Sequence, residues 1–386
     1  MPDAKGSSEK KLISDRSGSQ LETPSDDMVR RAIVSAGNAA SFLDFLRRAE
    51  AGHDLTIGVL GGSITAGSVC PQPEKRYHGV LLEFLRSRYP RSRFSLVNAG
   101  IGATDSCYGS FRAERDLLSG KPDMAVLEFA VNDNDSVLWG QSYEGVVRQI
   151  LTAGCPLILL FMTHDHLQNC QRLQEVIGRH YGLSMVSYRD AVMPELMRGT
   201  LKWEALSPDK VHPNPSAHSF AGKLLCALME KIIVAANAES KQLPPLPEAL
   251  FTDAFQSTFL MEDDTFCPVV SDGWTKLAEG DRQLRGRWHA SQAGSRMEFS
   301  FEGTSLWISY LGIEGAVGRI SVCVDDLAPV VFDSFFQHDW PGPKQFWLQA
   351  VSGLKQGVHK AVVTLLAEHH PEGGTEFYFC GAGGTR

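Results

Sequence analysis

From Leu55 to about residue 235, short apolar runs alternate with segments whose apolar residues recur at helical spacing. Continuous apolar runs of this length are typical of strands that are covered on both faces. The predicted strands are Leu55–Leu60, Phe94–Asn98, Met124–Ala130, Leu157–Met162 and Met185–Tyr188. Between them, one helical face carries Tyr77, Val80, Leu81, Phe84 and Leu85. This alternation predicts an α/β domain with a mainly parallel sheet and helices on both faces.

The last predicted helix begins at Asn214-Pro215, where Asn is the cap and Pro the first helical residue. After Asn237 the pattern changes to short alternating or β-branched runs separated by turns, which is typical of an all-β sandwich. The predicted organisation is a flexible tail (1–27), an α/β domain (28–240), a proline-rich linker (241–249) and a β-sandwich domain of the jelly-roll type (250–386).

Composition narrows the functional classes. The chain has 386 residues, 43% of them hydrophobic, which is enough for two globular cores. A net charge of -8 without a basic stripe argues against a nucleic-acid partner. No apolar run has membrane-spanning length and the N-terminus has no signal-peptide core, so we expect a cytoplasmic protein with no membrane contact. Eight scattered cysteines without a C-x-x-C pair predict reduced thiols, most of them buried.

Several polar residues directly follow predicted strands, at the sheet edge where sites of parallel α/β folds form. Ser63 follows the first strand in the segment Gly-Gly-Ser-Ile-Thr-Ala-Gly, where the glycines allow a sharp turn. The segment differs from the G-x-S-x-G elbow of α/β-hydrolases, because Thr65 occupies the place of the second glycine. Ser63 is therefore a candidate nucleophile, and a serine that only caps a helix is the structural alternative.

Asp209 and His212 stand three residues apart, a spacing at which the carboxylate can accept from the imidazole and fix its tautomer. An ordinary turn with a surface histidine is the alternative for this loose pattern. Asn132 and the glycine-rich loop from Asn98 to Thr104 could supply amide donors to an oxyanion, or could simply form turns.

Taken together, these segments resemble the SGNH (GDSL-type) hydrolase family, whose blocks carry Ser, Gly, Asn and His in this order. The resemblance covers roughly residues 53 to 235. It implies a flavodoxin-like three-layer α/β/α fold with Ser63 as nucleophile, His212 as base and Asp209 as its partner. It also assigns the oxyanion hole to Asn132 and to two backbone N–H groups, without a metal or organic cofactor.

The chain departs from the family pattern at two positions. Gly62 precedes the serine, where many members have Asp. The expected oxyanion glycine falls on Ala103, with Gly102 beside it. Because a backbone N–H is what the site needs, Ser63, Ala103 and Asn132 are the predicted oxyanion donors, with Gly102 as the fallback.

Other polar and aromatic residues are candidate binding groups. His164-Asp165-His166 follows the fourth predicted strand, and we expect His164 to face substrate rather than a metal. His218 is expected on the surface of the last helix. Most sandwich aromatics are expected in the core, but the segment Phe335–Trp347 suits a loop that stacks on sugar rings, with Trp340 as a candidate substrate contact.

The combined hypothesis is a serine ester hydrolase, specifically an O-acetylesterase acting on sugars or oligosaccharides. The sugar assignment depends on the family analogy and on a sandwich that resembles the accessory domain of some carbohydrate esterases. A lipid esterase, lysophospholipase or thioesterase is the alternative enzyme, and a carbohydrate-binding protein with an inactive hydrolase fold is the alternative class. The expected partner is a small-molecule or oligosaccharide ester, and the sequence is compatible with a homo-oligomer.

Overall fold

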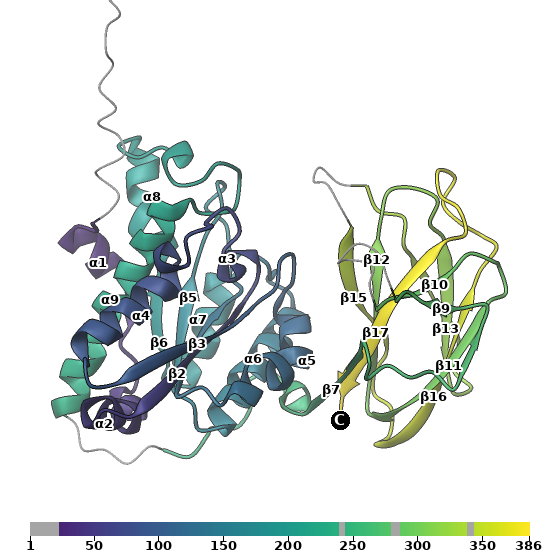
Figure 1. The fold of residues 1–386 in the computed structure, drawn as a ribbon, viewed down its shortest axis with the longest axis horizontal. Helices are drawn as coiled ribbons and strands as arrows, with labels where there is room; N and C mark the ends of the chain where they lie inside the picture. Colours follow the sequence, from purple (N-terminus) through teal and green to yellow (C-terminus); the bar gives the residue numbers. More distant parts are fainter. Residues whose placement is uncertain (1–22, 239–243, 279–285, 338–342) are drawn as a thin grey trace, which may run out of the picture.

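The computed structural model describes residues 23–238, 244–278, 286–337 and 343–386. Figure 1 shows two bodies side by side, an α/β domain and a β-sandwich. The predicted tail lies outside the described residues up to position 22, and the first helix already begins at Asp26, with Ser25 as its cap.

The α/β domain contains a six-stranded sheet in the order β1-β6-β5-β4-β2-β3, parallel except for β1. Its strands are β1 Ile33–Ser35, β2 Asp54–Gly61, β3 Arg93–Gly100, β4 Met124–Glu128, β5 Leu157–Phe161 and β6 Ser184–Ser187. The five predicted strands are confirmed within two residues at either end. The edge strand β1 was not predicted, and it pairs antiparallel with β6. The strand order reverses between β2 and β4, and such switch points are where parallel sheets place their sites.

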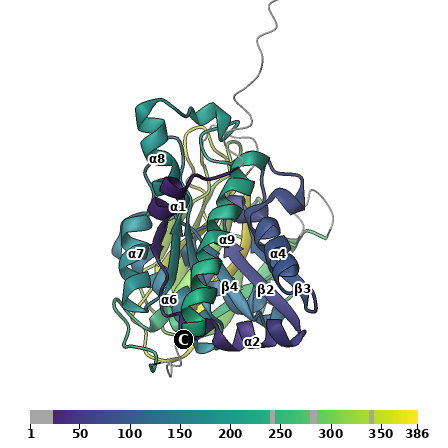
Figure 2. The ribbon, with the colours of Figure 1, turned by 90° about the vertical axis from the view of Figure 1, so that its left-hand side faces the viewer.

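Helices cover both faces of this sheet. They are α1 Asp26–Ala32, α2 Leu43–Ala51, α3 Ser63–Ala66, α4 Tyr77–Arg88, α5 Ser106–Asp116, α6 Val137–Thr152, α7 Gln171–His180, α8 Tyr188–Arg198 and α9 Pro215–Ala238. Short 3-10 turns cover Ala39–Phe42, Pro73–Lys75, Leu118–Gly120 and Trp203–Ala205. In Figure 2, α9 and α4 lie in front of the sheet. Figure 1 places α5 and α6 on the opposite side, facing the sandwich.

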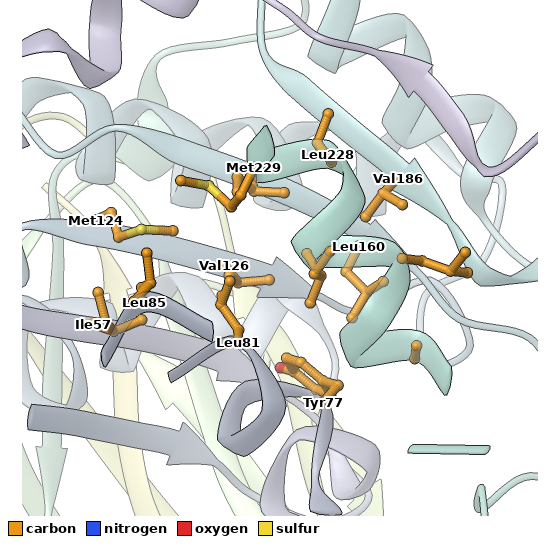
Figure 3. Packing of buried hydrophobic residues seen from close by; sticks show 14 of the residues in the cluster. Ile57, Tyr77, Leu81, Leu85, Met124, Val126, Leu160, Val186, Leu228 and Met229 are labelled. Atoms are coloured by element: carbon orange, nitrogen blue, oxygen red, sulfur yellow. The ribbon is translucent and has the colours of Figure 1, made fainter. Parts of the chain in front are cut away.

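The larger core lies between the sheet and the pair α4 and α9. Figure 3 shows Leu81 and Leu85 of α4 and Leu228 of α9 packed over Val126 and Leu160 of the central strands. All five side chains are fully buried. The helical spacing read from the sequence therefore places these residues where burial stabilises the domain most.

The second domain consists of two antiparallel sheets, so the predicted all-β class is confirmed. One sheet has the order β15-β12-β17-β10-β9 with β7 paired to β17, and the other has the order β14-β13-β16-β11-β8. The strands are β7 Thr258–Glu262, β8 Val270–Asp272, β9 Thr275–Lys276, β10 Trp288–Ala290, β11 Arg296–Gly303, β12 Leu306–Gly312, β13 Arg319–Val324, β14 Val330–Asp333, β15 Lys344–Val351, β16 Gly357–Leu365 and β17 Phe377–Thr385. A 3-10 turn, η5 (Ala254–Gln256), precedes β7.

The connection between the domains is held against α6 of the α/β domain. Buried Glu144 accepts hydrogen bonds from the backbone N–H groups of Leu250, Phe251 and Thr252. Gln149 of the same helix donates to the carbonyl of Phe255 at 2.8 Å. These bonds fix the entry into the sandwich, which docks its first sheet on α5 and η5 through buried Phe111, Phe255 and Trp307.

Candidate active site

Ser63 lies at the carboxyl end of β2, where Gly62 turns the chain into the short helix α3. The side chain of Ser63 is only 8% exposed. A Cβ atom at position 62 would lie 2.4 Å from Oδ1 of Asn132, a distance that real side chains do not tolerate. This close approach explains why glycine, rather than a residue with a side chain, precedes the serine.

The structure brings Ser63 together with His212 and Asp209, which lie almost 150 residues later. The Nε2 atom of His212 is 2.9 Å from Oγ of Ser63, and its Nδ1 atom is 2.8 Å from Oδ2 of Asp209. With the proton on Nδ1, the imidazole donates to the carboxylate and its Nε2 can accept the serine proton. This arrangement is the geometry required of a nucleophile, a general base and the group that orients the base.

Asp209 is held as a carboxylate by its own loop. Partial burial alone would raise its pKa, but hydrogen bonds from the backbone N–H groups of His212 and Val211, and from the imidazole, lower the pKa below the ordinary value. The carbonyl of Asp209 accepts from the indole of Trp203 at 2.6 Å. Ser207 donates its hydroxyl to the carbonyl of His212 at 2.6 Å, which fixes the other end of the loop.

A buried network beneath Ser63 holds helix α3 in place. The carbonyl of Thr65 accepts from Nδ2 of Asn98 at 3.1 Å and lies 3.3 Å from Nε2 of His78. The Thr65 hydroxyl lies 2.9 Å from the Tyr77 phenol and 3.2 Å from Oε2 of Glu128. Burial raises the pKa of Glu128 to about 8, although the hydrogen bond with Thr65 opposes the shift. At neutral pH this carboxyl group therefore carries a proton, while its Oε2 accepts from the Thr65 hydroxyl.

The predicted oxyanion donors lie around Ser63. A Cβ atom built on Gly102 would have the Cβ of Ser63, 3.8 Å away, as its nearest neighbour. Ala103 and Asn132 line the same cavity as Ser63. In the described part of the chain, no residue accepts a hydrogen bond from the backbone N–H of Ser63 or Ala103, or from Nδ2 of Asn132. All three are therefore available to an oxyanion.

Ala103 has a left-handed backbone, with φ 57°. Positive φ disfavours alanine, and the sequence offered Gly102 next to it as the fallback for this reason. In the structure, however, the left-handed conformation falls on the alanine and Gly102 has none. A strained alanine at this point is consistent with a loop whose shape is set by the site rather than by local preference.

The cavity above Ser63 has a volume of about 630 Å³ and is walled by both domains. The α/β domain supplies Asp105, Tyr108 and Trp139, besides the predicted residues, and the sandwich supplies the strand segment 344–348. Trp347 of that segment stacks on Tyr108 with 4.7 Å between ring centroids and an angle of 14°. The aromatic segment predicted as a sugar-stacking loop thus ends in an edge strand, β15, that reaches the candidate site.

Trp340 and His164 are the two predicted substrate contacts. Trp340 lies outside the described residues. His164 lies on a loop that is tied to the site by a hydrogen bond from Asp165 N–H to the carbonyl of Lys210, at 2.9 Å, but it is not among the described residues that line the cavity. Within the described ranges, no group of three or more His, Cys, Asp or Glu side chains could hold a metal ion.

The surface position expected for His218 is wrong. Its ring is fully buried beneath α4 and stacks on Tyr77, with 6.3 Å between centroids. Neither ring nitrogen has a hydrogen-bond partner in the described structure. Burial, with smaller contributions from His78, Arg76 and His212, lowers the pKa of His218 to about 3, so the ring is neutral.

The sequence also gave no sign of Arg112, a fully buried arginine on α5. Its guanidinium donates to the carbonyl of Ala99 at 2.6 Å and to that of Gly61 at 3.0 Å, at the ends of β3 and β2. These bonds tie together the two strand ends from which the Ser63 turn and the Gly102 loop begin. An arginine within a helix gives no local signal of such a role, because surface arginines follow the same pattern.

Comparison with known proteins finds a similar family for the α/β domain. The sequence profile of the GDSL-like Lipase/Acylhydrolase family matches residues 59–220, which include Ser63, Asn132 and His212. Over these residues the α/β domain is similar to the GDSL-like hydrolase family. The GDSL-like assignment makes the protein a carboxylic ester hydrolase and confirms the family resemblance seen in the sequence. No curated protein sequence gave a significant match.

Solved structures extend the similarity to the second domain. A two-domain esterase active on acetylated mannans is 28% identical to this chain. Its structure co-crystallized with mannopentaose covers 92% of this chain and 97% of its own, with a TM-score of 0.83. A second structure of a two-domain esterase active on acetylated mannans covers 92% and 98%, with a TM-score of 0.85. The α/β domain and the sandwich are therefore found together in another protein. Within the described residues, no helix combines the length and apolarity needed to cross a bilayer.

Proposed function

We propose that this protein is an O-acetylesterase that removes acetyl groups from sugars or oligosaccharides, with Ser63 as nucleophile. The observation that carries the proposal is the His212 imidazole, which bridges Ser63 at 2.9 Å and Asp209 at 2.8 Å beside a cavity walled by both domains. The similarity of almost the whole chain to an esterase active on acetylated mannans supports the choice of acetylated sugars.

In the proposed first half-reaction, Oγ of Ser63 attacks the acetyl carbonyl while Nε2 of His212 takes the serine proton. Asp209 stabilises the imidazolium that forms. The negative charge on the carbonyl oxygen is held by the N–H groups of Ser63 and Ala103 and by the amide of Asn132. Removing one such donor typically lowers kcat by roughly 10²–10³-fold. The imidazolium then protonates the sugar oxygen as the ester bond breaks, and the acetyl group stays on Ser63.

In the second half-reaction, water replaces the sugar hydroxyl. His212 takes a proton from the water as its oxygen attacks the acetyl-serine, and the same donors hold the second oxyanion. Acetate leaves when the Ser63 oxygen recovers its proton from the imidazolium. Every proton therefore moves through Nε2 of His212, which explains why its Nδ1 is pinned to Asp209.

The sandwich wall supports a sugar substrate in preference to a long acyl chain. Trp347 and Phe346 line the cavity and offer aromatic surface, and the Lys344 ammonium lies 5.1 Å from the Phe346 ring centroid. A cavity with aromatic faces, a cation and several hydroxyl and amide groups is typical of sites that orient a polar ligand through a few directed contacts. A lipid esterase would be expected to offer a continuous apolar channel instead.

The decisive experiment measures acetate released from acetylated oligosaccharides by the wild type and by Ser63→Ala. We expect the variant to lose at least about 10⁴-fold in kcat, as for other serine nucleophiles. Its Tm should stay close to that of the wild type, because the change removes only one oxygen. Acetate release by Ser63→Ala at the wild-type rate would refute the proposed mechanism.

Two further measurements separate the alternatives. Activity on p-nitrophenyl esters should fall steeply from acetyl to octanoyl; a rise would favour a lipid esterase or thioesterase. A fluorophosphonate should label Ser63 covalently in the wild type, with Ser63→Ala as the matched control. Absence of labelling together with tight oligosaccharide binding would identify a binding protein with an inactive hydrolase fold.

A further inference from the structure

A second cavity, of about 580 Å³, lies at the seam between the two domains. One wall comes from the start of α6 and includes Val137, Leu138 and Gln141. The facing wall comes from the sandwich and includes Gln349 and Ser352 at the end of β15. Nothing in the mechanism proposed above uses this cavity.

The second cavity adjoins the catalytic one along both walls. On α6, Leu138 lines the second cavity, and its chain neighbour Trp139 lines the catalytic cavity. On β15, Trp347 lines the catalytic cavity and Gln349 the second, and as alternate residues of one strand they share a face. Because neighbouring residues advance only about 1.5 Å along a helix and alternate residues only about 6.6 Å along a strand, the two cavities lie close together along the seam. A chain-like ligand that extends from the catalytic cavity along β15 therefore points toward the second cavity.

The walls of the second cavity suit a neutral ligand rich in hydroxyl groups. None of its described lining residues is Asp, Glu, Lys, Arg or His, and most carry hydroxyl, amide or aliphatic side chains. A phosphate or a uronate would require a cation, and a lipid chain would require mostly apolar walls. Val137, 65% exposed at the cavity, adds an apolar surface of the kind that packs against the C–H face of a sugar.

Two carboxamides on opposite walls provide the free hydrogen-bonding capacity. In the described part of the chain, the side chains of Gln141 and Gln349 make no hydrogen bond. Each amide offers two donors and one acceptor. The hydroxyls of Thr304 and Ser305 are already engaged, since they lie 2.9 and 2.8 Å from that of Thr385.

We infer that the second cavity is a subsite for unsubstituted, neutral sugar residues of the same oligosaccharide whose acetylated residue occupies the catalytic cavity. The inference rests on the proposed function and adds to it a preference for longer chains. Gln141 and Gln349 hold the distal sugar from both sides of the seam, so the two domains bind one ligand together.

The test compares kcat and KM of the wild type and of the double variant Gln141→Ala/Gln349→Ala on acetylated manno-oligosaccharides of two and of six residues. Losing the hydrogen bonds of both amides should raise KM for the hexasaccharide roughly tenfold at unchanged kcat. KM for the disaccharide and activity on p-nitrophenyl acetate should not change. Gln292→Ala, at an exposed position elsewhere on the sandwich, is the matched control. Equal effects on both chain lengths, or none on either, would overturn the subsite.

Two further measurements test the subsite independently of the proposed function. Ser352→Trp should fill the cavity and produce the same length-dependent rise in KM. Binding of unacetylated mannohexaose to Ser63→Ala, measured by calorimetry, needs no turnover and should weaken roughly tenfold when both glutamines are replaced. If the wild type releases no acetate from any sugar yet this weakening is seen, the proposed function fails and the subsite stands. Unchanged mannohexaose binding overturns the subsite alone.

Discussion

Tyr108 of α5 donates its phenol to the Glu262 carboxylate of β7 at 2.8 Å, across 154 residues of sequence. Glu262 is only 4% exposed and also accepts from Arg115 and from Gln345, each at 3.0 Å. Tyr108 and Gln345 both line the catalytic cavity, one from each domain. This single carboxylate therefore links the two walls of the site.

Replacing Glu262 should loosen the cavity without touching the chemistry. Glu262→Ala leaves Tyr108, Arg115 and Gln345 without their shared acceptor, so we expect a loss of about 2 kcal/mol in the free energy of unfolding. KM for acetylated oligosaccharides should rise, while kcat on p-nitrophenyl acetate stays within a few-fold of wild type. Denaturant unfolding and steady-state kinetics measure both effects.

Glu262→Gln keeps an acceptor of the same shape and should fall between the wild type and the alanine variant. Glu302→Ala removes an exposed carboxylate of the same domain and serves as the control. If Glu262→Ala changed kcat and KM equally on both substrates, the carboxylate would act on the chemistry rather than on the spacing of the walls.

The left-handed backbone at Ala103 predicts how this position responds to substitution. Ala103→Gly keeps the N–H and relieves the strain, so kcat should remain within a few-fold of wild type. Ala103→Val places a β-branched side chain at positive φ, which is strongly disfavoured, so the N–H should move away from the oxyanion. We expect kcat of the valine variant to fall by roughly 10²–10³-fold, as after loss of one oxyanion donor. Similar rates for the two variants would exclude this N–H from the oxyanion hole.

Glu128 should make the protein less stable as pH rises. Its pKa is raised from 4.5 to about 8 in the folded protein, so between these values the folded state holds a proton that the unfolded state has lost. Stability contributed by this group is full below about pH 4.5 and declines by roughly 1.4 kcal/mol per pH unit up to about pH 8. Glu128→Gln keeps an acceptor for the Thr65 hydroxyl and cannot ionise, so its unfolding free energy should fall less between pH 5 and 9. Glu302→Gln should leave the wild-type slope unchanged.

His218 should make the protein less stable as pH falls into the acidic range. Its pKa is lowered from 6.5 to about 3 in the folded state, so below about pH 6.5 the unfolded state takes up a proton that the folded state refuses. This costs about 2 kcal/mol of stability at pH 5. His218→Phe keeps a ring against Tyr77 and removes two unpartnered nitrogens. The variant should therefore lose less stability than wild type between pH 7 and 5, as measured by urea unfolding.

His166→Phe, at an exposed position, is the control for this experiment. If the unfolding free energy of His218→Phe fell with pH as steeply as that of the wild type, another group would govern the acid sensitivity. His78 is the first to examine, because burial lowers its pKa to about 4.

The strands that the sequence predicted well are those whose own residues indicate that they are buried. β5 is apolar along its whole length and β4 is apolar up to its last residue, Glu128, and both are buried throughout, so composition alone identifies them. β1 is three residues long and only partly buried, and it exists because Ile33 pairs with Val186 of β6. β17 contains Gly-Ala-Gly-Gly, which reads as a loop. Its glycines allow close packing, since a Cβ at Gly384 would lie 2.1 Å from the carbonyl oxygen of Ser305.

The same division applies to the site. Ser63, Asp209 and His212 could be found because each follows a recognisable strand or precedes a recognisable helix. The wall formed by Trp347 could be suspected from its aromatic neighbours but not placed, because no local pattern tells which sheet of the sandwich docks on α5. His218 was misplaced because its polar ring gave no sign that α4 covers it.

The bond-breaking groups, including Ser63 and His212, come from the α/β domain, whereas Lys344 to Leu348 of the sandwich form much of the opposite wall. These two parts of the site can therefore change independently during evolution. Mutations in the edge strand can change the lining of the cavity while Ser63, Asp209 and His212 stay in place. Among proteins of this architecture, we therefore expect ligand specificity to vary through the sandwich and the reaction to be preserved by the residues on the parallel sheet.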